Sequence, residues 1–185
     1  MKISVISDTH GSLQGWESAL RLISKTDATI HCGDLFSPGF NPLPEQFSPK
    51  KLLQEFNKLE KQFLVVRGNC DGDLYSNILA IPVADPFLVY QVSETRILAA
   101  HGHLMTEEEI ALLAERWKID ILITGHTHKW KLEKHVNLIW LNPGSPSIPK
   151  EEPSAAIVDT DKRLIKVCNL DTKEILAESP FLKIS

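Results

Sequence analysis

The sequence predicts an α/β fold in which two packed, mixed β-sheets carry helices on their outer faces. In the first half of the chain, short apolar runs alternate with segments whose apolar residues recur at helical spacing. In the second half, strand-like segments follow one another with turns between them. The chain has 185 residues, of which 43% are hydrophobic, so we expect one core and a single domain over residues 1–185.

The first half has the pattern of parallel strands joined by helices. Its strand-like runs are short and apolar, and they are Ile3 to Ile6, Ala28 to His31 and Phe63 to Val66. Helices are expected where apolar residues are three or four positions apart, first at Trp16, Ala19, Leu20 and Ile23 and then at Leu52, Leu53, Phe56 and Leu59. Phe36 to Pro49 contains four prolines, which predict an irregular loop.

The second half predicts antiparallel strands. Its strands are expected at Phe87 to Val92, Arg96 to Ala100, Ile121 to Ile123, Asn137 to Leu141, Ala155 to Val158, Leu164 to Asn169 and Glu174 to Ala177. One helix interrupts them: Thr106 and Glu109 form a capping box, and its buried face is expected at Ile110, Leu113, Ala114 and Trp117. A second proline-rich loop is expected at Asn142 to Pro153.

Composition argues against several classes of protein. The formal net charge is -4 and no block of Lys or Arg stands out, so a nucleic-acid-binding surface is not expected. Three widely spaced cysteines without a C-x-x-C pair argue against a disulfide framework or a Cys-rich zinc site, and they favour reduced thiols in the cytoplasm. No apolar run approaches the roughly 18 residues of a membrane span.

Five short polar motifs carry the chemistry, and nearly all follow a strand-like run. They are Asp8-Thr9-His10, Gly33-Asp34, Gly68-Asn69-Cys70-Asp71, His101-Gly102-His103 and Gly125-His126-Thr127-His128. Side chains that follow successive strands gather at one edge of a sheet, as the ligands of a metal cluster must. If these segments are extended, residues i and i+2 point the same way, so Asp8 with His10, and His126 with His128, each present two groups to one side.

The donor types in these motifs suit divalent ions. Carboxylate, amide and imidazole ligands favour Mn, Fe, Co or Zn. There are seven candidate ligands, too many for one tetrahedral site and about right for two ions that share a carboxylate: Asp8, His10, Asp34, Asn69, His101, His126 and His128. Two ions about 3.5–4 Å apart form a standard clamp for displacement at phosphorus.

The order of the motifs resembles the calcineurin-like metallophosphoesterase superfamily. The short length, Gly68-Asn69-Cys70-Asp71 and Asn142-Pro143-Gly144-Ser145 are similar to its small stand-alone bacterial and archaeal phosphodiesterases. The resemblance covers Met1 to about Pro149 and implies a four-layer α/β/β/α sandwich. It also implies one ion held by Asp8, His10 and His128, a second held by Asn69, His101 and His126, and Asp34 as the bridge.

The same resemblance bears on catalysis. Many family members have His where this chain has Cys70, and that His, paired with the next Asp, serves as an acid or transition-state contact. A thiol is a poor hydrogen-bond donor, so esters with good leaving groups are expected to be favoured. His103 is the candidate contact for the substrate phosphate. Asp71 either supports the ligand loop or is an exposed turn residue, and His31 is expected in the interior.

These observations predict a dinuclear phosphodiesterase in which a metal-bridging hydroxide attacks small phosphodiesters. Mn is the expected metal, with Fe, Zn, Co or Ni as alternatives. A protein-interaction scaffold similar to the retromer subunit with this fold, a phosphomonoesterase and a nuclease are the alternative functions. We expect no membrane contact and no stable nucleic-acid partner. The Phe- and Pro-rich loop after Asp34 makes a homodimer plausible.

Overall fold

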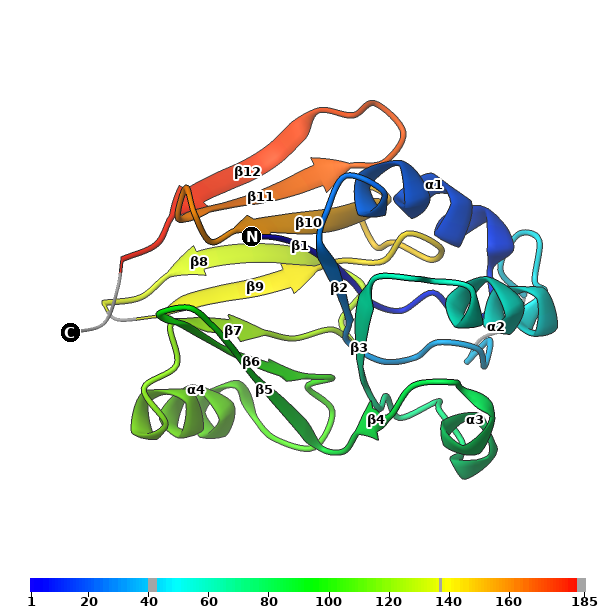
Figure 1. Cartoon of the computed structure of the whole chain (residues 1–185), viewed down its shortest axis with the longest axis horizontal. Helices are drawn as coiled ribbons and strands as arrows, with labels where there is room; N and C mark the ends of the chain where they lie inside the picture. The colour runs from blue at the N-terminus through cyan, green and yellow to red at the C-terminus, as the bar shows by residue number, and fades with distance from the viewer. Residues whose placement is uncertain (40–42, 137, 183–185) are drawn as a thin grey trace.

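The computed structural model describes residues 1–39, 43–136 and 138–182. Its backbone forms two β-sheets that lie face to face, with helices on the outer face of each (Figure 1). Among the described residues, no helix is both long enough and apolar enough to cross a membrane.

The larger sheet has seven strands in the order β12-β11-β10-β1-β2-β3-β4. Their bounds are β1 Lys2–Ile6, β2 Ala28–His31, β3 Gln62–Val66, β4 Val83–Ala84, β10 Ser154–Asp159, β11 Leu164–Asn169 and β12 Ile175–Pro180. Strands β1 to β4 are parallel, and β10 joins the other edge of β1 in antiparallel fashion. The sheet is therefore mixed, because it unites the first strands of the chain with the last.

The smaller sheet has five strands in the order β5-β6-β7-β9-β8. Their bounds are β5 Phe87–Val92, β6 Thr95–Ala100, β7 Ile121–Ile123, β8 Trp130–Lys134 and β9 Ile139–Pro143. The central strands β6, β7 and β9 are parallel, while β5 and β8 pair antiparallel at the edges. The second half is thus not purely antiparallel, and that part of the sequence prediction is wrong.

The helices begin at capped or preorganised positions. They are α1 Leu13–Ile23, α2 Pro49–Asn57, α3 Asp73–Ile78 and α4 Glu107–Arg116. Ser12 caps α1 by accepting a hydrogen bond from the Gly15 amide at 3.1 Å. The predicted capping box of α4 is present, with both of its hydrogen bonds formed. Pro49 is not part of a loop, as predicted, but the first residue of α2, where a proline costs no intrahelical hydrogen bond.

Three apolar clusters define four layers. The central cluster lies between the sheets and includes Ile3 of β1 and Ile121 of β7. A second packs α1 and α2 on the larger sheet, with Trp16 and Phe56 in edge contact. A third packs α4 on the smaller sheet. The layers therefore run helix, sheet, sheet, helix, as the family resemblance implied.

Several predicted elements differ from the structure. Strands β4 and β8 and helix α3 were not predicted, because they are short or carry mostly polar residues. Asn142 belongs to β9 and not to a loop. Trp117 follows α4 and is 36% exposed, so it is not on the buried face. Asn137 and residues 40–42 of the predicted loop lie outside the described residues.

Candidate metal centre

Five strand ends bring the predicted ligands to one place between the two sheets. The strands β1, β2 and β3 of the larger sheet and β6 and β7 of the smaller sheet each end just before one of the polar motifs. The two sheets meet there: His101 Nε2, after β6, lies 3.4 Å from Asp34 Oδ2, after β2. The convergence follows from the parallel order of these strands, whose carboxyl ends lie at one edge of each sheet.

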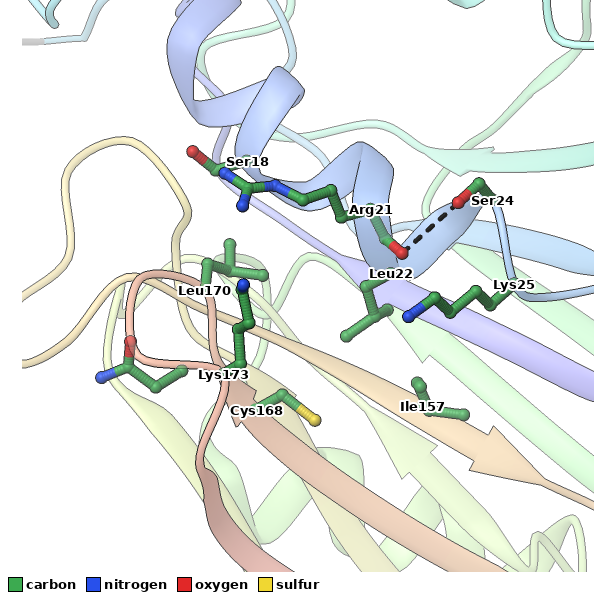
Figure 2. A pocket seen from close by; sticks show the side chains of 10 residues that line it. Ser18, Arg21, Leu22, Ser24, Lys25, Ile157, Cys168, Leu170 and Lys173 are labelled. Carbon is green, nitrogen blue, oxygen red and sulfur yellow. Dashed lines mark hydrogen bonds between the residues drawn. The ribbon is translucent and has the colours of Figure 1, made fainter.

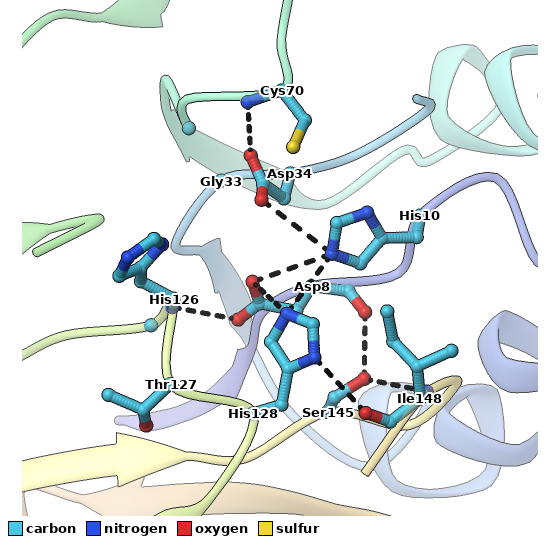
Figure 3. A network of polar contacts seen from close by, with 12 residues as sticks. Asp8, His10, Gly33, Asp34, Cys70, His126, Thr127, His128, Ser145 and Ile148 are labelled. Carbon is cyan, nitrogen blue, oxygen red and sulfur yellow. Dashed lines mark hydrogen bonds and ion pairs between the residues drawn. The ribbon is translucent and has the colours of Figure 1, made fainter. Parts of the chain in front are cut away.

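Two groups of ligand atoms form at this edge. Asp8, His10 and His128 each offer an atom within 4.8 Å of the others (Figure 3), and so do Asp34, His101 and His126. Within the first group, Asp8 Oδ1 lies 3.8 Å from His10 Nε2 and 3.3 Å from His128 Nε2. Both groups therefore have the compactness that one ion needs.

Asp34 belongs to the second group and also faces His10 of the first. Its Oδ2 atom is 3.6 Å from His10 Nε2 and 3.4 Å from His101 Nε2. Its Oδ1 atom accepts a hydrogen bond from the Cys70 amide at 2.8 Å. Burial by itself raises the pKa of Asp34, but the hydrogen bond and charge of His101 outweigh it and hold that pKa well below its usual range. Asp34 is therefore a carboxylate with one oxygen facing both groups.

Three imidazoles are oriented by backbone carbonyls. His10 Nδ1 lies 2.7 Å from the Ser37 carbonyl, His101 Nδ1 lies 2.6 Å from that of Cys32, and His128 Nδ1 lies 3.1 Å from that of Ile148. A carbonyl accepts only, so each Nδ1 must carry the proton. When Nε2 carries no proton, its lone pair faces the carboxylates, which is the usual tautomer of a metal-ligating histidine.

The buried atoms of the first group fit a cation. Asp8 is fully buried, and its Oδ1 accepts no hydrogen bond from any described residue. A buried carboxylate oxygen left without a donor is costly unless a cation neutralises it. The two Nε2 atoms of His10 and His128 are also only 3.2 Å apart. With both Nδ1 atoms protonated, a cation between these two lone pairs removes their repulsion, so the residues present fit a metal ion.

Asn69 completes the second group with an amide oxygen. Its Oδ1 atom lies 3.0 Å from His101 Nε2, although the residue as a whole is exposed. Gly68, just before it, allows the chain to approach Asp34 closely, since a Cβ at position 68 would collide with the Asp34 backbone nitrogen and carboxylate. All seven predicted ligands thus lie at this one edge.

The backbone geometry of the ligands differs from the prediction. Five of the seven have a left-handed backbone, with φ between 44° and 68°: Asp8, His10, Asp34, His126 and His128. Such residues are uncommon and cluster at functional sites. The extended segments assumed for residues i and i+2 are therefore absent at these motifs. Accordingly, His126 and His128 belong to different groups.

Asp71 lies beneath the loop that carries Asp34. Its carboxylate accepts hydrogen bonds from the amides of Asp34 at 2.8 Å, Leu35 at 2.8 Å and Gly68 at 2.9 Å. The residue is 5% exposed, and burial raises its pKa despite these amides. Of the two alternatives that the sequence left open, the structure supports the one in which Asp71 holds the ligand loop.

Thr9 links the Asp8 motif to the Asp34 loop and to His31. Its hydroxyl donates to the Leu35 carbonyl at 2.9 Å and lies 3.0 Å from His31 Nε2. His31 is fully buried, as expected, and its Nδ1 accepts from the Gly33 amide at 3.2 Å. Burial lowers the pKa of His31 to about 3, so the ring is neutral and ties the Asp8 loop to the Asp34 loop. A buried His at a strand end was the signal for this contact.

A second set of contacts holds the Asp8 motif and the Gly125 motif from the end of β9 and the loop after it. Ser145 Oγ donates to the Asp8 carbonyl at 2.8 Å, and its neighbour Ser147 donates to the Thr9 carbonyl at 2.9 Å. Asn142 Nδ2 donates to the Gly125 carbonyl at 2.7 Å, just before His126. These contacts therefore brace the site.

Cys70 and His103 border the centre. Cys70 Sγ offers a third group of compact ligand atoms with His10 and Asp34, and burial and the Asp34 charge raise the pKa of the thiol to about 12. The His103 ring lies 5.3 Å from that of His101 and 6.2 Å from that of His126, centroid to centroid. Its Nδ1 is buried and has no hydrogen-bond partner among the described residues.

Comparison with known proteins places this geometry in a family. The family model of the calcineurin-like phosphoesterase superfamily domain matches residues 1–163. Phosphodiesterase YfcE of Escherichia coli strain K12 is 33% identical over 181 residues, which cover 96% of this chain and 97% of YfcE. Phosphodiesterase MJ0936 of Methanocaldococcus jannaschii is 26% identical over 172 residues, covering 88% and 95% of the two chains.

The solved structures agree with this assignment. The structure of YfcE, described as a phosphoesterase from E. coli, superposes with a TM-score of 0.85 at 30% identity and covers 98% of this chain and all of that one. The chain therefore belongs to the calcineurin-like phosphoesterase superfamily.

Proposed function

We propose that this protein is a dinuclear metal-dependent phosphodiesterase that hydrolyses small phosphodiesters. The observation that carries the proposal is the position of Asp34 Oδ2, 3.6 Å from His10 Nε2 and 3.4 Å from His101 Nε2, between two compact groups of ligand atoms. Two divalent ions, when bound, activate water for attack and neutralise the phosphoryl oxygens in the transition state.

The ligand groups suggest how the ions are shared. Asp8, His10 and His128 would hold one ion, and Asn69, His101 and His126 would hold the other. Asp34 would bridge them through its Oδ2 atom. The absence of a required thiolate ligand and the mixture of oxygen and nitrogen donors support Mn, with Fe, Zn, Co or Ni as alternatives.

Residues beside the ligands would serve the reaction. The His103 ring, whose centroid lies 6.2 Å from that of His126, is a group that could contact a substrate phosphate near the second ion. Asp71 would act as a positioning residue, because its carboxylate holds the amides of the Asp34 loop. Cys70 would be a weak donor to the leaving oxygen, which supports a preference for good leaving groups.

The substrate class rests on the relatives and on charge. The relatives YfcE and MJ0936 are both named phosphodiesterases. The net charge of -4 supports a small diester over a polynucleotide, whose backbone calls for many cations. Three free cysteines support the cytoplasm as the compartment. A homodimer through the loop after Asp34 stays a prediction.

The test compares a diester with its monoester under controlled metal loading. Chelated protein is supplied with Mn, Fe, Zn, Co or Ni and assayed on bis(p-nitrophenyl) phosphate and p-nitrophenyl phosphate. We expect no turnover after chelation, recovery with Mn, and faster hydrolysis of the diester. Activity that survives metal removal would rule out the mechanism, and a monoester preference would make the protein a phosphatase. Two bound metals without turnover of any phosphoester would favour the scaffold.

A further inference from the structure

A hollow of about 460 Å³ lies on the outer face of the larger sheet, between α1 and strands β10 and β11 (Figure 2). The second half of α1 forms one wall, and the end of β11 with the following turn forms the other. None of its lining residues belongs to the metal centre. Its volume lies within the range of about 300–1,000 Å³ that is usual for small-molecule sites.

The floor of the hollow is aliphatic. Leu22 of α1, Ile157 of β10 and Cys168 of β11 are half-buried, and Leu170 beside them is 6% exposed. Burial raises the pKa of the Cys168 thiol, so this side chain is neutral and behaves as a small apolar group. No aromatic side chain lines the hollow. The floor therefore suits a flexible aliphatic chain better than a planar ring that needs stacking.

The rim of the hollow is cationic. Arg21 extends over it from α1, Lys173 rises from the turn after β11, and Lys25 lies beside Leu22 (Figure 2). No Asp or Glu is among the lining residues, although the chain has a net charge of -4. In the part of the chain that the structure describes, no ion pair involves any of these three cations. Their positive charge is therefore available to a ligand.

We propose that this hollow binds a small aliphatic anion, with the head group on Arg21 and Lys173 and the chain on the floor. Arg21 is suited to a phosphate, carboxylate or sulfonate because its guanidinium donates two parallel hydrogen bonds. Three cations are too few to bind along a nucleic-acid backbone. The aliphatic floor is small, so it has room for only a short alkyl chain. The site is separate from the proposed phosphodiesterase centre and does not depend on it.

The test uses octane-1-sulfonate, which a phosphoesterase cannot hydrolyse, below its micelle concentration and with metal-loaded protein. Isothermal titration compares the wild type with the double variant Arg21→Ala/Lys173→Ala. Binding to the metal centre is the same in both proteins, so the difference reports the hollow. We expect the double variant to bind about tenfold more weakly, which corresponds to about 1.4 kcal/mol. The exposed lysine variant Lys51→Ala is the matched control and should bind like the wild type.

Further arms separate the head group from the chain. Octyl phosphate and octanoate should bind in the same hollow, whereas methanesulfonate and octanol, which lack the chain or the charge, should bind at least about tenfold more weakly. Ile157→Thr should weaken octanesulfonate binding and leave methanesulfonate unchanged, and its thermal unfolding shows whether the fold is kept. Equal affinity in the wild type and the double variant, or binding only to anionic lipid vesicles, would overturn the proposal.

Discussion

His10 Nε2 and His128 Nε2 lie 3.2 Å apart at the metal centre, although 118 positions separate them in the chain. The Nδ1–H group of each ring donates a hydrogen bond to a backbone carbonyl. The Nε2 lone pairs of the two rings therefore face each other beside the buried Asp8 carboxylate. Two such nitrogens repel unless a proton or a metal ion lies between them. The protein therefore has an arrangement that a bound cation stabilises.

Asp34→Asn should weaken metal binding at both positions. The substitution removes the charge of the one carboxylate whose Oδ2 faces both groups, and an amide is a poorer ligand for a divalent ion. We expect Mn affinity to fall about a hundredfold or more, because substitution of a residue that only hydrogen-bonds to a metal ligand already costs about 10–100-fold. Isothermal titration measures the stoichiometry, with the exposed Asp171→Asn as control. A variant that still binds two ions with wild-type affinity would exclude the bridge.

Asp71→Asn should destabilise the protein and loosen the Asp34 loop. An asparagine has one accepting oxygen, so at least one of the three backbone amides now held by the carboxylate loses its partner. Each buried donor left unsatisfied costs about 1–3 kcal/mol. Urea unfolding measures the change in the free energy of unfolding, and Mn titration should show weaker binding.

The matched control for Asp71→Asn is Asp73→Asn, two residues later. Asp73 is 86% exposed and pairs with Arg67 on the surface, and such pairs contribute about 0–1 kcal/mol. Equal effects of the two substitutions would mean that Asp71 does not hold the ligand loop.

His31 makes the stability of the protein depend on pH. Burial lowers its pKa to about 3 in the folded state, from an unfolded value of 6.5. Between these values the unfolded chain binds a proton that the folded protein does not, so stability is lost as the pH falls from 6.5 towards 3. The slope from this one group is at most about 1.4 kcal/mol per pH unit.

The variant His31→Gln should flatten that slope. It is expected to be less stable than the wild type at pH 7, because it disturbs the contact with Thr9, yet to lose less stability between pH 7 and 5. Urea unfolding of chelated protein at several pH values measures both effects. His135→Gln is the control, since the His135 side chain is 49% exposed. Parallel stability curves for wild type and His31→Gln would contradict the neutral buried ring.

His103→Ala should lower kcat without loss of metal. The ring borders His101 and His126, so it lies where it can contact a substrate phosphate held by the ions. Removal of such a donor typically costs about 10²–10³ in kcat. Steady-state kinetics on the diester and Mn stoichiometry are measured together, with His135→Ala as control. Full activity with two metals bound would remove His103 from the mechanism.

Cys70→His should raise the rate most for esters with poor leaving groups. An imidazole donates a proton to the departing oxygen far better than a thiol does, and general acid catalysis contributes about 10²–10⁴-fold. A series of aryl diesters with leaving groups of rising pKa gives the slope of log kcat against that pKa, which should become shallower. Cys70→Ser is the control that removes the thiol without adding an acid. The same slope in Cys70→His and the wild type would mean that position 70 does not face the leaving group.

The seven candidate ligands could be named from the sequence because each lies in a short polar motif near the end of a strand. Strands at Ala28–His31 and Ile121–Ile123 have the predicted bounds, because a strand that is buried on both faces is a continuous apolar run that can be recognised in the sequence. The Asp, Asn and His residues in the polar motif after each strand identify the oxygen and nitrogen atoms that could bind a metal ion. By contrast, β8 and α3 were missed, because a short, mostly polar segment has no clear hydrophobic period.

What the sequence by itself determined is the class of fold, the seven candidate ligands and the chemistry of their donors. The family resemblance implied how they are divided, and the tertiary structure supplied the backbone geometry that produces this division. His126 and His128 are two positions apart, yet their left-handed backbones send them to different groups, and no pattern of side-chain types reveals a positive φ at a non-glycine residue. The tertiary structure also decided that Asp71 is buried under the Asp34 loop, because the sequence does not distinguish a buried aspartate from an exposed aspartate in a turn. The left-handed backbone of the ligands and the burial of Asp71 both depend on packing between segments far apart in the chain. A buried polar group loses its water, so it is stable only where backbone donors such as the Asp34 and Leu35 amides can replace that water.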